Sequence, residues 1–473
     1  MVSVETRGTH GDLLHRVVQR GMVELRQVLD AADRTLPAFV WRELERYLGC
    51  GDPAQGFAWL ECDCGHHRLV PFSCKGRAFC PACGGRRMAE RAARWCDELF
   101  PFVPHRQWVL TVPWPRRRLL AFRPELARGV LGLALKEVFG WLTARAAFEH
   151  GVSGATAGAV TVEQRFGSSL ALNLHFHSLL PDGVFARDAA GVVRFHRVSP
   201  SRDDLVELVE RIALRCEAWL AAQGVDDEEE DPDDAQAVLV AASAVGRVAT
   251  GSRAGRPVRR AGVEPGRGDE DEPGRGVSCG GYGLHAGTWV PAHDRAGLER
   301  LSRYLLRPPL AKGRLEERPD GQVAWHLRRP WRDGTTGFVF SALELTEKLA
   351  ALVLRPRVHS VHFHGVFAAH AALRPEVVVD PAEVARRRDA ESATRAERTL
   401  ARRKGPSRRR RWSAWCPWAL LLERVFGTGG FHCPRCGGQL RLRTVVVGLP
   451  ATTRILASLA RSARGPPAPT PAP

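Results

Sequence analysis

Alternating hydrophobic and polar positions predict an antiparallel sheet in the middle of the chain. Every second residue of 160–166 lies on one side of an extended segment, and Gly167-Ser168-Ser169 then supplies a turn. From 170 to 177, leucine and phenylalanine alternate with alanine or polar residues, and Pro181-Asp182-Gly183 supplies a second turn. Successive side chains of a strand point to opposite faces, so this pattern predicts a meander with one buried face.

Helical spacing of hydrophobic residues predicts a helix-rich stretch over residues 1–48, interrupted at Pro37. A further helix over 294–307 must end before Pro308-Pro309, because proline disfavours the helical conformation of the residue before it. The other predicted elements are helices over 124–150 and 342–353, and strands over 107–113, 322–328 and 337–340.

Two segments interrupt the ordered pattern. Residues 226–234 are almost all acidic, and 251–281 are rich in glycine, arginine and proline, so both are expected to be loop or disordered insert. Residues 237–248 form an ordered island between them. Farther along, 383–411 carry a dense run of arginine, which is either a helix or tail that contacts a polyanion or a solvated linker.

The charge balance favours a nucleic-acid partner. The chain has 473 residues, 69 Lys and Arg against 52 Asp and Glu, and a net charge of +17. No apolar run reaches the ~18 residues of a membrane span, and the N-terminus does not resemble a signal peptide. We therefore expect a cytoplasmic protein without a membrane partner. The absence of a phosphate-cradling Gly-rich motif predicts no nucleotide cofactor.

Twelve cysteines in a reducing compartment indicate metal binding more than disulfides. Cys80-Pro-Ala-Cys83-Gly-Gly presents two thiolates to one ion, and a second pair must complete a tetrahedral Zn²⁺ site. The nearest pair is Cys62 and Cys64, with Cys74, His66 or His67 as substitutes. Cys433-Pro-Arg-Cys436 repeats the same turn near the C-terminus, and whether it binds zinc stays open.

Two histidines on the predicted meander can bind one divalent ion. His175 and His177 are two residues apart, so both project from the same face of a strand while Leu174 and Phe176 anchor the other face. A pair of polar residues on a solvated strand face explains the pattern equally well. His362 and His364 have the same spacing, so the pattern does not separate the two pairs.

Tyr304 stands on the predicted helix 294–307, at the boundary between an apolar stripe and a basic side. The basic side carries Arg300, Arg303 and Arg307. A free phenol is a weak nucleophile at neutral pH, but nearby cations favour the phenolate and a metal on a phosphate makes phosphorus more electrophilic. A boundary tyrosine that reaches solvent with its hydroxyl is the alternative.

Several motifs in order resemble the insertion-sequence-91 (IS91) family of rolling-circle transposases, over about 35–450. They are the cysteine module that ends in Phe72-Ser-Cys-Lys-Gly-Arg-Ala-Phe-Cys-Pro-Ala-Cys-Gly-Gly-Arg-Arg-Met88, Gln107-Trp-Val-Leu-Thr-Val-Pro113, Leu172-Asn-Leu-His-Phe-His177, Arg303-Tyr-Leu-Leu-Arg-Pro-Pro309, His364-Gly-Val-Phe367 and Cys433-Pro-Arg-Cys436. The cysteines Cys62 and Cys64 depart from the family, which spaces this pair by two residues, and this departure puts the fourth zinc ligand in doubt.

The resemblance implies an α+β protein, in which an antiparallel-sheet HUH nuclease domain with flanking helices follows a small cysteine-rich zinc-binding module. It implies catalysis by Tyr304 with Mg²⁺ or Mn²⁺ on His175 and His177, and we expect Gln164 as third ligand. His362 and His364 then become a chance match, with His364 structural. Position 300 is Arg and 308 is Pro, so the chain resembles the single-tyrosine branch. Arg300, Arg303 and Arg307 are expected to contact DNA.

The expected activity is nicking and rejoining of single-stranded DNA at mobile-element ends through a 5′-phosphotyrosine, in bacterial cytoplasm. The expected parts are a helical and zinc-binding module (1–100), the catalytic domain (101–375) with a disordered insert near 224–282, the arginine-rich segment (376–411) and a C-terminal unit with a disordered tail (412–473). A replication initiator of the same chemistry, a zinc-dependent DNA-binding protein without nuclease activity and an inactive transposase copy remain alternatives.

Overall fold

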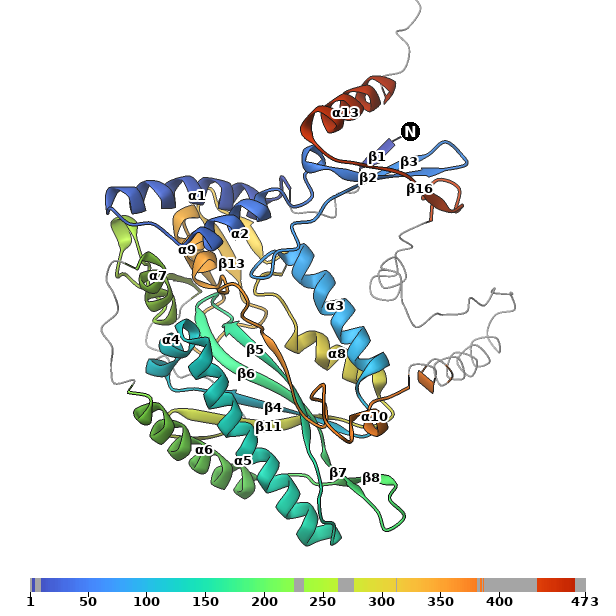
Figure 1. Ribbon diagram of the computed structural model, residues 1–473. Coiled ribbons are helices and arrows are strands. Elements are labelled where there is room, and N and C mark those ends of the chain that lie inside the picture. Colours follow the sequence, from blue (N-terminus) through green and yellow to red (C-terminus); the bar gives the residue numbers. More distant parts are fainter. Residues whose placement is uncertain are drawn as a thin grey trace, which may run out of the picture.

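A six-stranded antiparallel sheet forms the centre of the molecule (Figure 1). The computed structural model describes residues 2–4, 10–224, 234–262, 276–311, 313–380, 383, 384, 386 and 432–463. The strand order is β10-β11-β4-β6-β5-β15, and all neighbours are antiparallel. The bounds are β4 His105–Thr111, β5 Gly158–Phe166, β6 Leu172–Pro181, β10 Val277–Cys279, β11 Tyr282–Val290 and β15 Val361–Gly365. The predicted meander is therefore confirmed as β5 and β6.

Helices cover both faces of this central sheet (Figure 1). On one face, Leu174 and Phe176 are buried in a core shared with α5 (Pro124–His150) and α6 (Arg202–Ala222). On the other face, hydrophobic residues of β5 and β6 pack with residues of α3 (Pro81–Glu98) and α8 (Arg295–Leu305). The fold is thus the expected mixture of helices and antiparallel sheet, with its strands between two helical layers.

The helix α8 begins and ends for local reasons. Asp294 caps its N-terminus, where the carboxylate accepts a hydrogen bond from the Gly297 N–H at 2.7 Å. The helix ends at Leu305, two residues earlier than expected, and Pro308 and Pro309 follow within four residues. This early end leaves Arg307 beyond the last turn.

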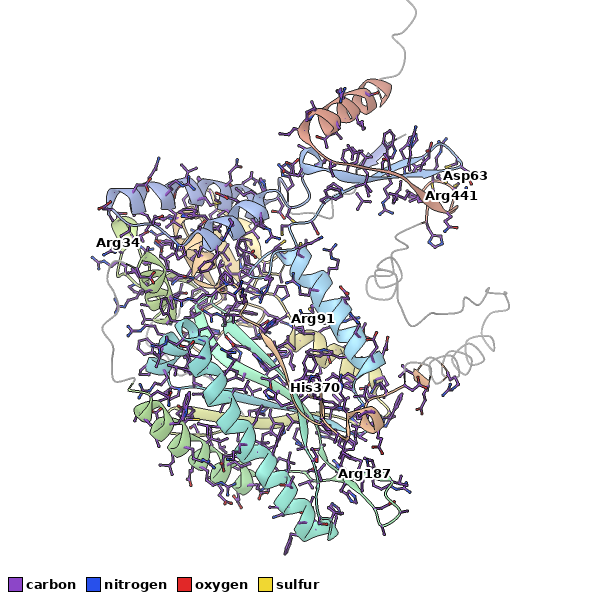
Figure 2. All side chains as sticks on the ribbon, viewed as in Figure 1. Arg34, Asp63, Arg91, Arg187, His370 and Arg441 are labelled. Atoms are coloured by element: carbon purple, nitrogen blue, oxygen red, sulfur yellow. The ribbon has the colours of Figure 1, made fainter. Side chains whose placement is uncertain are left out.

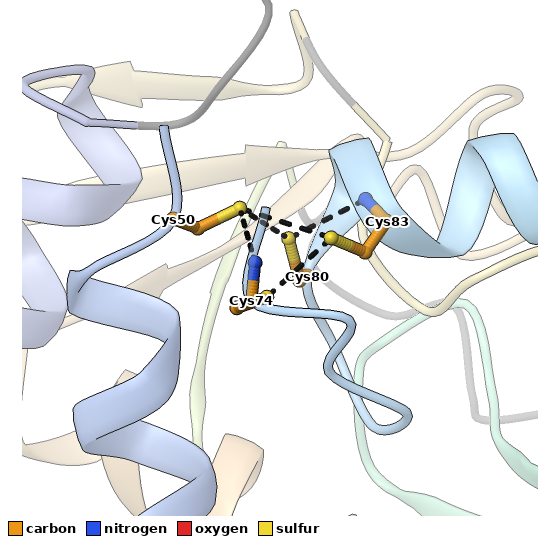
Figure 3. Close-up of side chains that lie close together, drawn as sticks. All are labelled: Cys50, Cys74, Cys80 and Cys83. Carbon is orange, nitrogen blue, oxygen red and sulfur yellow. Dashed lines mark hydrogen bonds between the residues drawn. The ribbon is translucent and has the colours of Figure 1, made fainter. Parts of the chain in front are cut away.

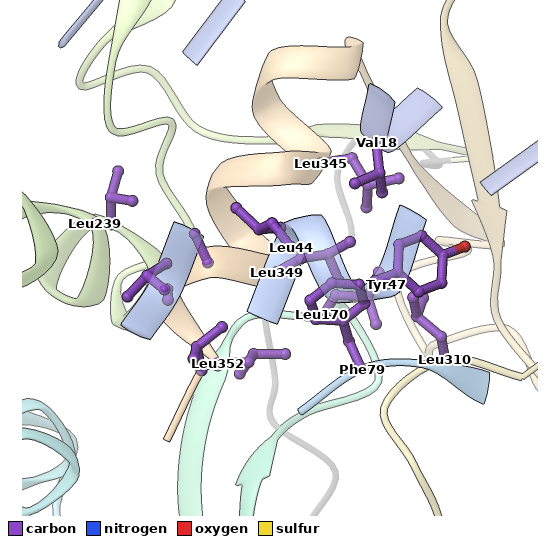
Figure 4. Close-up of a cluster of buried hydrophobic side chains, with 14 of the residues drawn as sticks. Val18, Leu44, Tyr47, Phe79, Leu170, Leu239, Leu310, Leu345, Leu349 and Leu352 are labelled. Atoms are coloured by element: carbon purple, nitrogen blue, oxygen red, sulfur yellow. The ribbon is translucent and has the colours of Figure 1, made fainter. Parts of the chain in front are cut away.

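A second region packs helices on a small sheet with the order β12-β13-β14-β9. Its core joins Val18, Leu44, Leu239, Leu345 and Leu349, among others (Figure 4). The elements are α1 Leu13–Ala31, α2 Ala38–Leu48, α7 Ala235–Ala244, α9 Ala342–Ala351, β9 Arg259–Ala261, β12 Leu315–Glu317, β13 Val323–His326 and β14 Gly337–Phe340. Part of the expected insert at 224–282 is therefore ordered, since α7 packs against α9 and β9 extends the sheet.

A third sheet joins sequence from both ends of the chain (Figure 1). Its order is β1-β3-β2-β16, with β1 Val2–Val4, β2 Phe57–Cys62, β3 His67–Pro71 and β16 Leu440–Val446. Helix α13, Leu449–Ala463, follows β16 and packs on this sheet through Ile455 and Leu456. The expected separate C-terminal unit is therefore wrong for these residues, because β16 completes a sheet of the N-terminal module.

The remaining elements connect these regions. They are α4 Trp114–Phe122, α10 Arg374–Val377, the ribbon β7 Gly183–Arg187 with β8 Val193–Arg197, and short 3₁₀ turns at Pro53–Gln55 and Gly251–Arg253. Most of the arginine run at 383–411 lies outside the described residues, as do 225–233 and 263–275 of the expected insert. Among the helices of the described ranges, none is long and apolar enough to cross a membrane.

Candidate active site and metal centres

His175 and His177 lie side by side on the face of β6 that looks toward α8. In the sheet register His175 is opposite Thr111 and Gln164, and His177 is opposite Val109 and Val162. The two ring centroids are 4.8 Å apart with an interplanar angle of 70°. The strand alternation therefore places both imidazoles together, as the spacing predicted.

Hydrogen bonds orient both rings. The Nδ1 of His175 lies 2.8 Å from the Asn173 carbonyl oxygen, to which it donates, so its lone pair is on Nε2. The Nδ1 of His177 lies 2.8 Å from the Gln107 side-chain amide. A half-turn of that amide exchanges its nitrogen and oxygen, and the oxygen then accepts a hydrogen bond from the Nδ1–H. The Nε2 of His177 is buried and has no hydrogen-bond partner within the described structure.

Burial keeps both imidazoles neutral at neutral pH. Desolvation lowers the pKa of His175 to about 4, and it lowers the pKa of His177 well below its usual value, with a further contribution from His175. A neutral imidazole has the lone pair that a metal ion needs. The electrostatics of the pair thus suit a ligand role.

Gln164 connects the histidine pair to the end of α8. Its Nε2 donates a hydrogen bond to the Leu305 carbonyl oxygen at 2.9 Å, and the Tyr304 carbonyl oxygen lies 3.5 Å away. Its Oε1 is buried and lacks a hydrogen-bond partner within the described ranges. Gln164 is directly opposite His175 in the strand register. The Oε1 of Gln164 and the Nε2 of His177 are thus two buried atoms without a hydrogen-bond partner in the described structure, and they lie on adjacent strands. The Nε2 of His175 carries a lone pair beside them.

Tyr304 lies against the histidine pair. Its ring centroid is 5.8 Å from that of His177, in an edge-to-face arrangement of 83°, and the residue is 41% exposed. The guanidinium carbon of Arg307 is 4.4 Å from the tyrosine ring centroid. The phenol is therefore both accessible and beside a cation, on the face of the sheet that carries the imidazoles.

The other two arginines expected to contact DNA, Arg300 and Arg303, lie on α8 and pair with carboxylates. Arg303 forms an ion pair with Glu299, and Arg300 lies 3.6 Å from an Asp294 oxygen. Arg300 is largely exposed. Of the three arginines expected to contact DNA, Arg307 is the one that the structure brings next to Tyr304.

The rival histidine pair lies on the opposite face of the sheet. On β15, His362 is opposite Thr161 and His364 is opposite Ala159, whereas Val361 is opposite Val162, which shares the face of His177. Burial lowers the pKa of His364 to about 4. The sheet separates this pair from Tyr304, so the two pairs cannot form one site.

A cavity lies between α3 and the end of α8. Leu305 and Pro308 line one side, and Arg77, Arg87 and Arg91 line the other. Burial, with Arg87 and Arg77 nearby, lowers the pKa of Arg91, since three guanidinium groups converge there. A Cβ at Gly84 would lie 2.7 Å from the Cβ of Pro308, so glycine permits this close contact between α3 and the segment that follows α8. The cavity is thus a basic recess, and Leu305, the residue that follows Tyr304, lines it.

Eight of the cysteines in the described residues gather in two clusters of four, and the predicted set is divided between them. Figure 3 shows the first of these clusters. Cys80 and Cys83 lie with Cys50 and Cys74, whereas Cys62 and Cys64 lie with Cys433 and Cys436. Grouping Cys62 and Cys64 with Cys80 and Cys83 was therefore wrong. The reason is the pairing of β2 with β3 and β16, which carries the loop of Cys62 and Cys64 away from α3.

The first cluster has the geometry of a closed four-thiolate site. The Cys74 and Cys83 sulfurs are 3.5 Å apart, and the Cys50 sulfur is 3.7 Å from Cys80 and 3.8 Å from Cys83. Hydrogen bonds to Cys74 and Cys80 lower the pKa of Cys50 to about 7. A Zn–S bond of about 2.3 Å in a tetrahedron separates sulfurs by about 3.8 Å. Cys74, one of the predicted substitutes, belongs here, and Cys50 was missed although it precedes the module directly.

Two family models match the chain. Residues 22–112 match the model described as "Transposase zinc-binding domain", and residues 158–374 match the model described as "Putative transposase". The first match spans the first cysteine cluster and ends at β4, and the second spans β5, β6 and α8. Together they cover well over half of the chain.

Fold, cysteine module and matches define a transposase with an N-terminal zinc-binding domain. The chain belongs to the IS91 family of transposases, as its motifs predicted. No curated protein and no solved structure matches it.

Proposed function

We propose that this transposase cuts and rejoins single-stranded DNA at element ends, with Tyr304 as the nucleophile and a divalent ion on His175, His177 and Gln164. The observation that carries the proposal is the position of Tyr304, whose ring lies 5.8 Å from that of His177 on the imidazole face of the sheet. An exposed phenol beside two neutral imidazoles and a cation is an arrangement suited to phosphoryl transfer.

The residues present fit Mg²⁺ or Mn²⁺. The Nε2 of His177 and the Oε1 of Gln164 are buried atoms whose hydrogen-bonding capacity no described group satisfies. Such atoms cost free energy unless a ligand satisfies them. An amide oxygen such as that of Gln164 suits Mg²⁺ or Mn²⁺, and Mg²⁺ uses few protein ligands together with phosphate oxygens. When bound, the ion supplies positive charge at the scissile phosphate.

The transfer of the phosphoryl group to Tyr304 and back to DNA would proceed in two steps. The Tyr304 oxygen attacks phosphorus in line, the bond from phosphorus to the 3′-oxygen breaks, and a 5′-phosphotyrosine and a 3′-hydroxyl form. The phenol proton leaves to solvent, and the released 3′-oxygen takes a proton from solvent. The reverse attack by a 3′-hydroxyl restores Tyr304 and joins strands without a nucleotide cofactor. Arg307, over the tyrosine ring, stabilises negative charge as it develops.

The basic recess beside α8 would hold the DNA backbone next to Tyr304. Arg77, Arg87 and Arg91 line it, and guanidinium groups bind phosphate oxygens well. We further propose that residues 1–100 act as the zinc-binding module, with the first ion on Cys50, Cys74, Cys80 and Cys83, and that 101–375 act as the catalytic domain. Arg300 and Arg303 would contact DNA farther from the tyrosine.

The test is covalent capture of single-stranded DNA that contains the element end, with Mn²⁺ and the full chain. Wild type forms an adduct that survives denaturation, and Tyr304→Phe forms none. His175→Ala also loses the adduct, because one donor is gone, whereas His362→Ala on the opposite face keeps it. An adduct in Tyr304→Phe equal to that of the wild type would show that another residue is the nucleophile. Loss of the adduct in His362→Ala but not in His175→Ala would show that the metal binds on the opposite face of the sheet.

A further inference from the structure

The second cysteine cluster is built from two parts of the chain that are far apart in sequence. Cys62 is the last residue of β2 and Cys64 lies in the turn before β3, whereas Cys433 and Cys436 lie in the turn before β16. The sulfurs of Cys62 and Cys436 are 3.5 Å apart, those of Cys64 and Cys433 are 3.6 Å apart, and all four lie within 4.8 Å of one another. Four sulfurs at such distances have the spacing of a tetrahedral Zn–S site.

The backbone around these sulfurs is shaped like two facing knuckles. The Gly65 N–H donates to the Cys62 carbonyl oxygen at 2.9 Å, and the Gly437 N–H donates to the Cys433 carbonyl oxygen at 2.9 Å. Both glycines have positive φ, 74° and 71°, which favours glycine at these turns. In each turn, the glycine that follows the second cysteine thus closes a tight loop around two thiols.

Gly438 has a role specific to the sulfurs. Its N–H donates to the Cys436 sulfur at 3.4 Å. A Cβ at this position would lie 3.2 Å from the Cys436 sulfur and 3.5 Å from the Cys62 sulfur. A side chain there would enter the space between sulfurs that come from the two distant segments. The Cys-Pro-Arg-Cys-Gly-Gly sequence is therefore adapted to this four-sulfur arrangement.

At the cysteine end of the pairing of β16 with β2 the supporting protein interactions are few, whereas at the other end Phe57 and Val446 share a second core with α13. Leu60, Leu440 and partly buried Val70 are the hydrophobic neighbours of the buried Cys62 and Cys433. The cross-strand ion pair of Asp63 with Arg441 is 3.8 Å long and exposed at the tip of the sheet (Figure 2). Exposed ion pairs contribute little, and closing a loop of several hundred residues costs conformational entropy. An ion on four thiolates adds stabilisation at the cysteine end of the pair, where this core is small.

We propose that Cys62, Cys64, Cys433 and Cys436 bind a second zinc ion, and that this ion holds β16 on β2. The matched zinc-binding domain ends at residue 112 and so contains half of these ligands. The site does not depend on Tyr304 or on the histidine pair, and it stands whether or not the proposed cleavage chemistry holds.

Metal content of the full chain, purified without chelator, tests the site. The wild type carries two zinc ions per chain. The double variants Cys433→Ser/Cys436→Ser and Cys62→Ser/Cys64→Ser each carry one zinc ion per chain. The variant with all four substitutions also carries one zinc ion, because both cysteine pairs belong to a single site. Cys279→Ser, a cysteine outside both clusters, keeps two. One zinc in the wild type, two in Cys433→Ser/Cys436→Ser, or iron in place of zinc would each overturn the proposal.

Hydrogen exchange tests what the ion holds together. In Cys433→Ser/Cys436→Ser, amides of β2 and β16 exchange faster, whereas amides of β5 and β6 in the central sheet keep their protection. That protection also shows that the variant is folded. Loss of one zinc with unchanged protection of β16 would overturn the conclusion that the ion fastens this strand.

Discussion

Gln107 is the residue that sets the orientation of the His177 ring. The residue is 4% exposed, and its side-chain amide lies 2.8 Å from the His177 Nδ1. A partner at Nδ1 fixes which ring nitrogen keeps its lone pair, and removal of such partners commonly weakens metal binding by ~10–100-fold. In this proposal Gln107 acts through His177 and is a positioning residue.

Gln107→Ala should therefore lower the affinity for Mn²⁺ by about 10–100-fold, measured by titration of the full chain. Gln107→Glu, which keeps an oxygen at the same place, should restore most of the affinity. Equal affinity in Gln107→Ala and wild type would mean that the ring does not need this partner.

His105 should make stability depend on pH. Burial lowers its pKa to about 3, its Nδ1 donates to the Val103 carbonyl oxygen at 2.8 Å, and its ring packs on Phe100. The unfolded chain takes up a proton below about pH 6.5 and the folded chain does not. This group therefore lowers stability as pH falls from about 6.5 toward 3, by about 1.4 kcal/mol per pH unit.

Urea unfolding at pH 7.5 and pH 5 checks this effect. His105→Gln, which cannot be protonated, should lose less stability than the wild type on going to pH 5. The exposed His370→Gln should behave like the wild type. An equal loss in all three proteins would show that His105 is accessible to protons in the folded state.

The histidine pairs and Tyr304 show what the sequence alone could not predict about the site. The spacing of His175 and His177 predicted a shared strand face, but the same spacing held for His362 and His364. The face of the sheet on which each pair lies follows from the pairing of β15 with β5, which no local pattern contains. The close approach of Tyr304 to His177 likewise depends on how α8 packs on the sheet.

At the scale of elements, a glycine sets the distance between α1 and α9. A Cβ at Gly21 would lie 2.1 Å from the Thr346 Oγ1 and 2.2 Å from the Ala342 carbonyl oxygen. Because the oxygen of Ala342 belongs to backbone, the helices must move apart to admit a methyl group. This pair of helices carries much of the core around Leu345 and Leu349 (Figure 4).

Gly21→Ala should destabilise the protein by about 1–3 kcal/mol, with a lower melting temperature in calorimetry. Gly132 on α5 meets open space, so Gly132→Ala should instead stabilise by up to about 1 kcal/mol through helix propensity. A Gly21→Ala variant as stable as the wild type would contradict the close packing of α1 on α9.

Elements with strong periodicity were predicted well, and those fixed by distant partners were not. The helix over 124–150 and the strand over 337–340 have the expected bounds. The short strand β9 lies in a segment rich in glycine and arginine, and its pairing with β14 is what orders it. The grouping of the cysteines into two sites depends on the pairing of β16 with β2, which are far apart in sequence. A prediction that paired cysteines by their closeness in sequence was therefore wrong.

At the scale of the whole molecule, the net charge of +17 predicts salt-sensitive DNA binding. Each phosphate contact to single-stranded DNA contributes about −0.7 to the slope of log affinity against log salt. Anisotropy titrations with Tyr304→Phe, which does not form the adduct, should give a steep negative slope.

Arg91→Gln should reduce that slope by roughly one contact. Arg34→Gln removes the same charge at the far end of α1 and should leave the slope close to that of the parent (Figure 2). If Arg91→Gln leaves the slope unchanged, the DNA does not contact the basic recess.

The sheet that joins β2 and β16 also has a consequence for biosynthesis. Strand β2 leaves the ribosome nearly 400 residues before β16, its partner. At ~5–20 residues per second this interval lasts about 20–80 s. Throughout it one edge of β2 offers unpaired backbone groups, which other chains can pair with. A ribosome that stops before residue 440 therefore releases a polypeptide with this edge open, and such a fragment should be prone to aggregation and degradation.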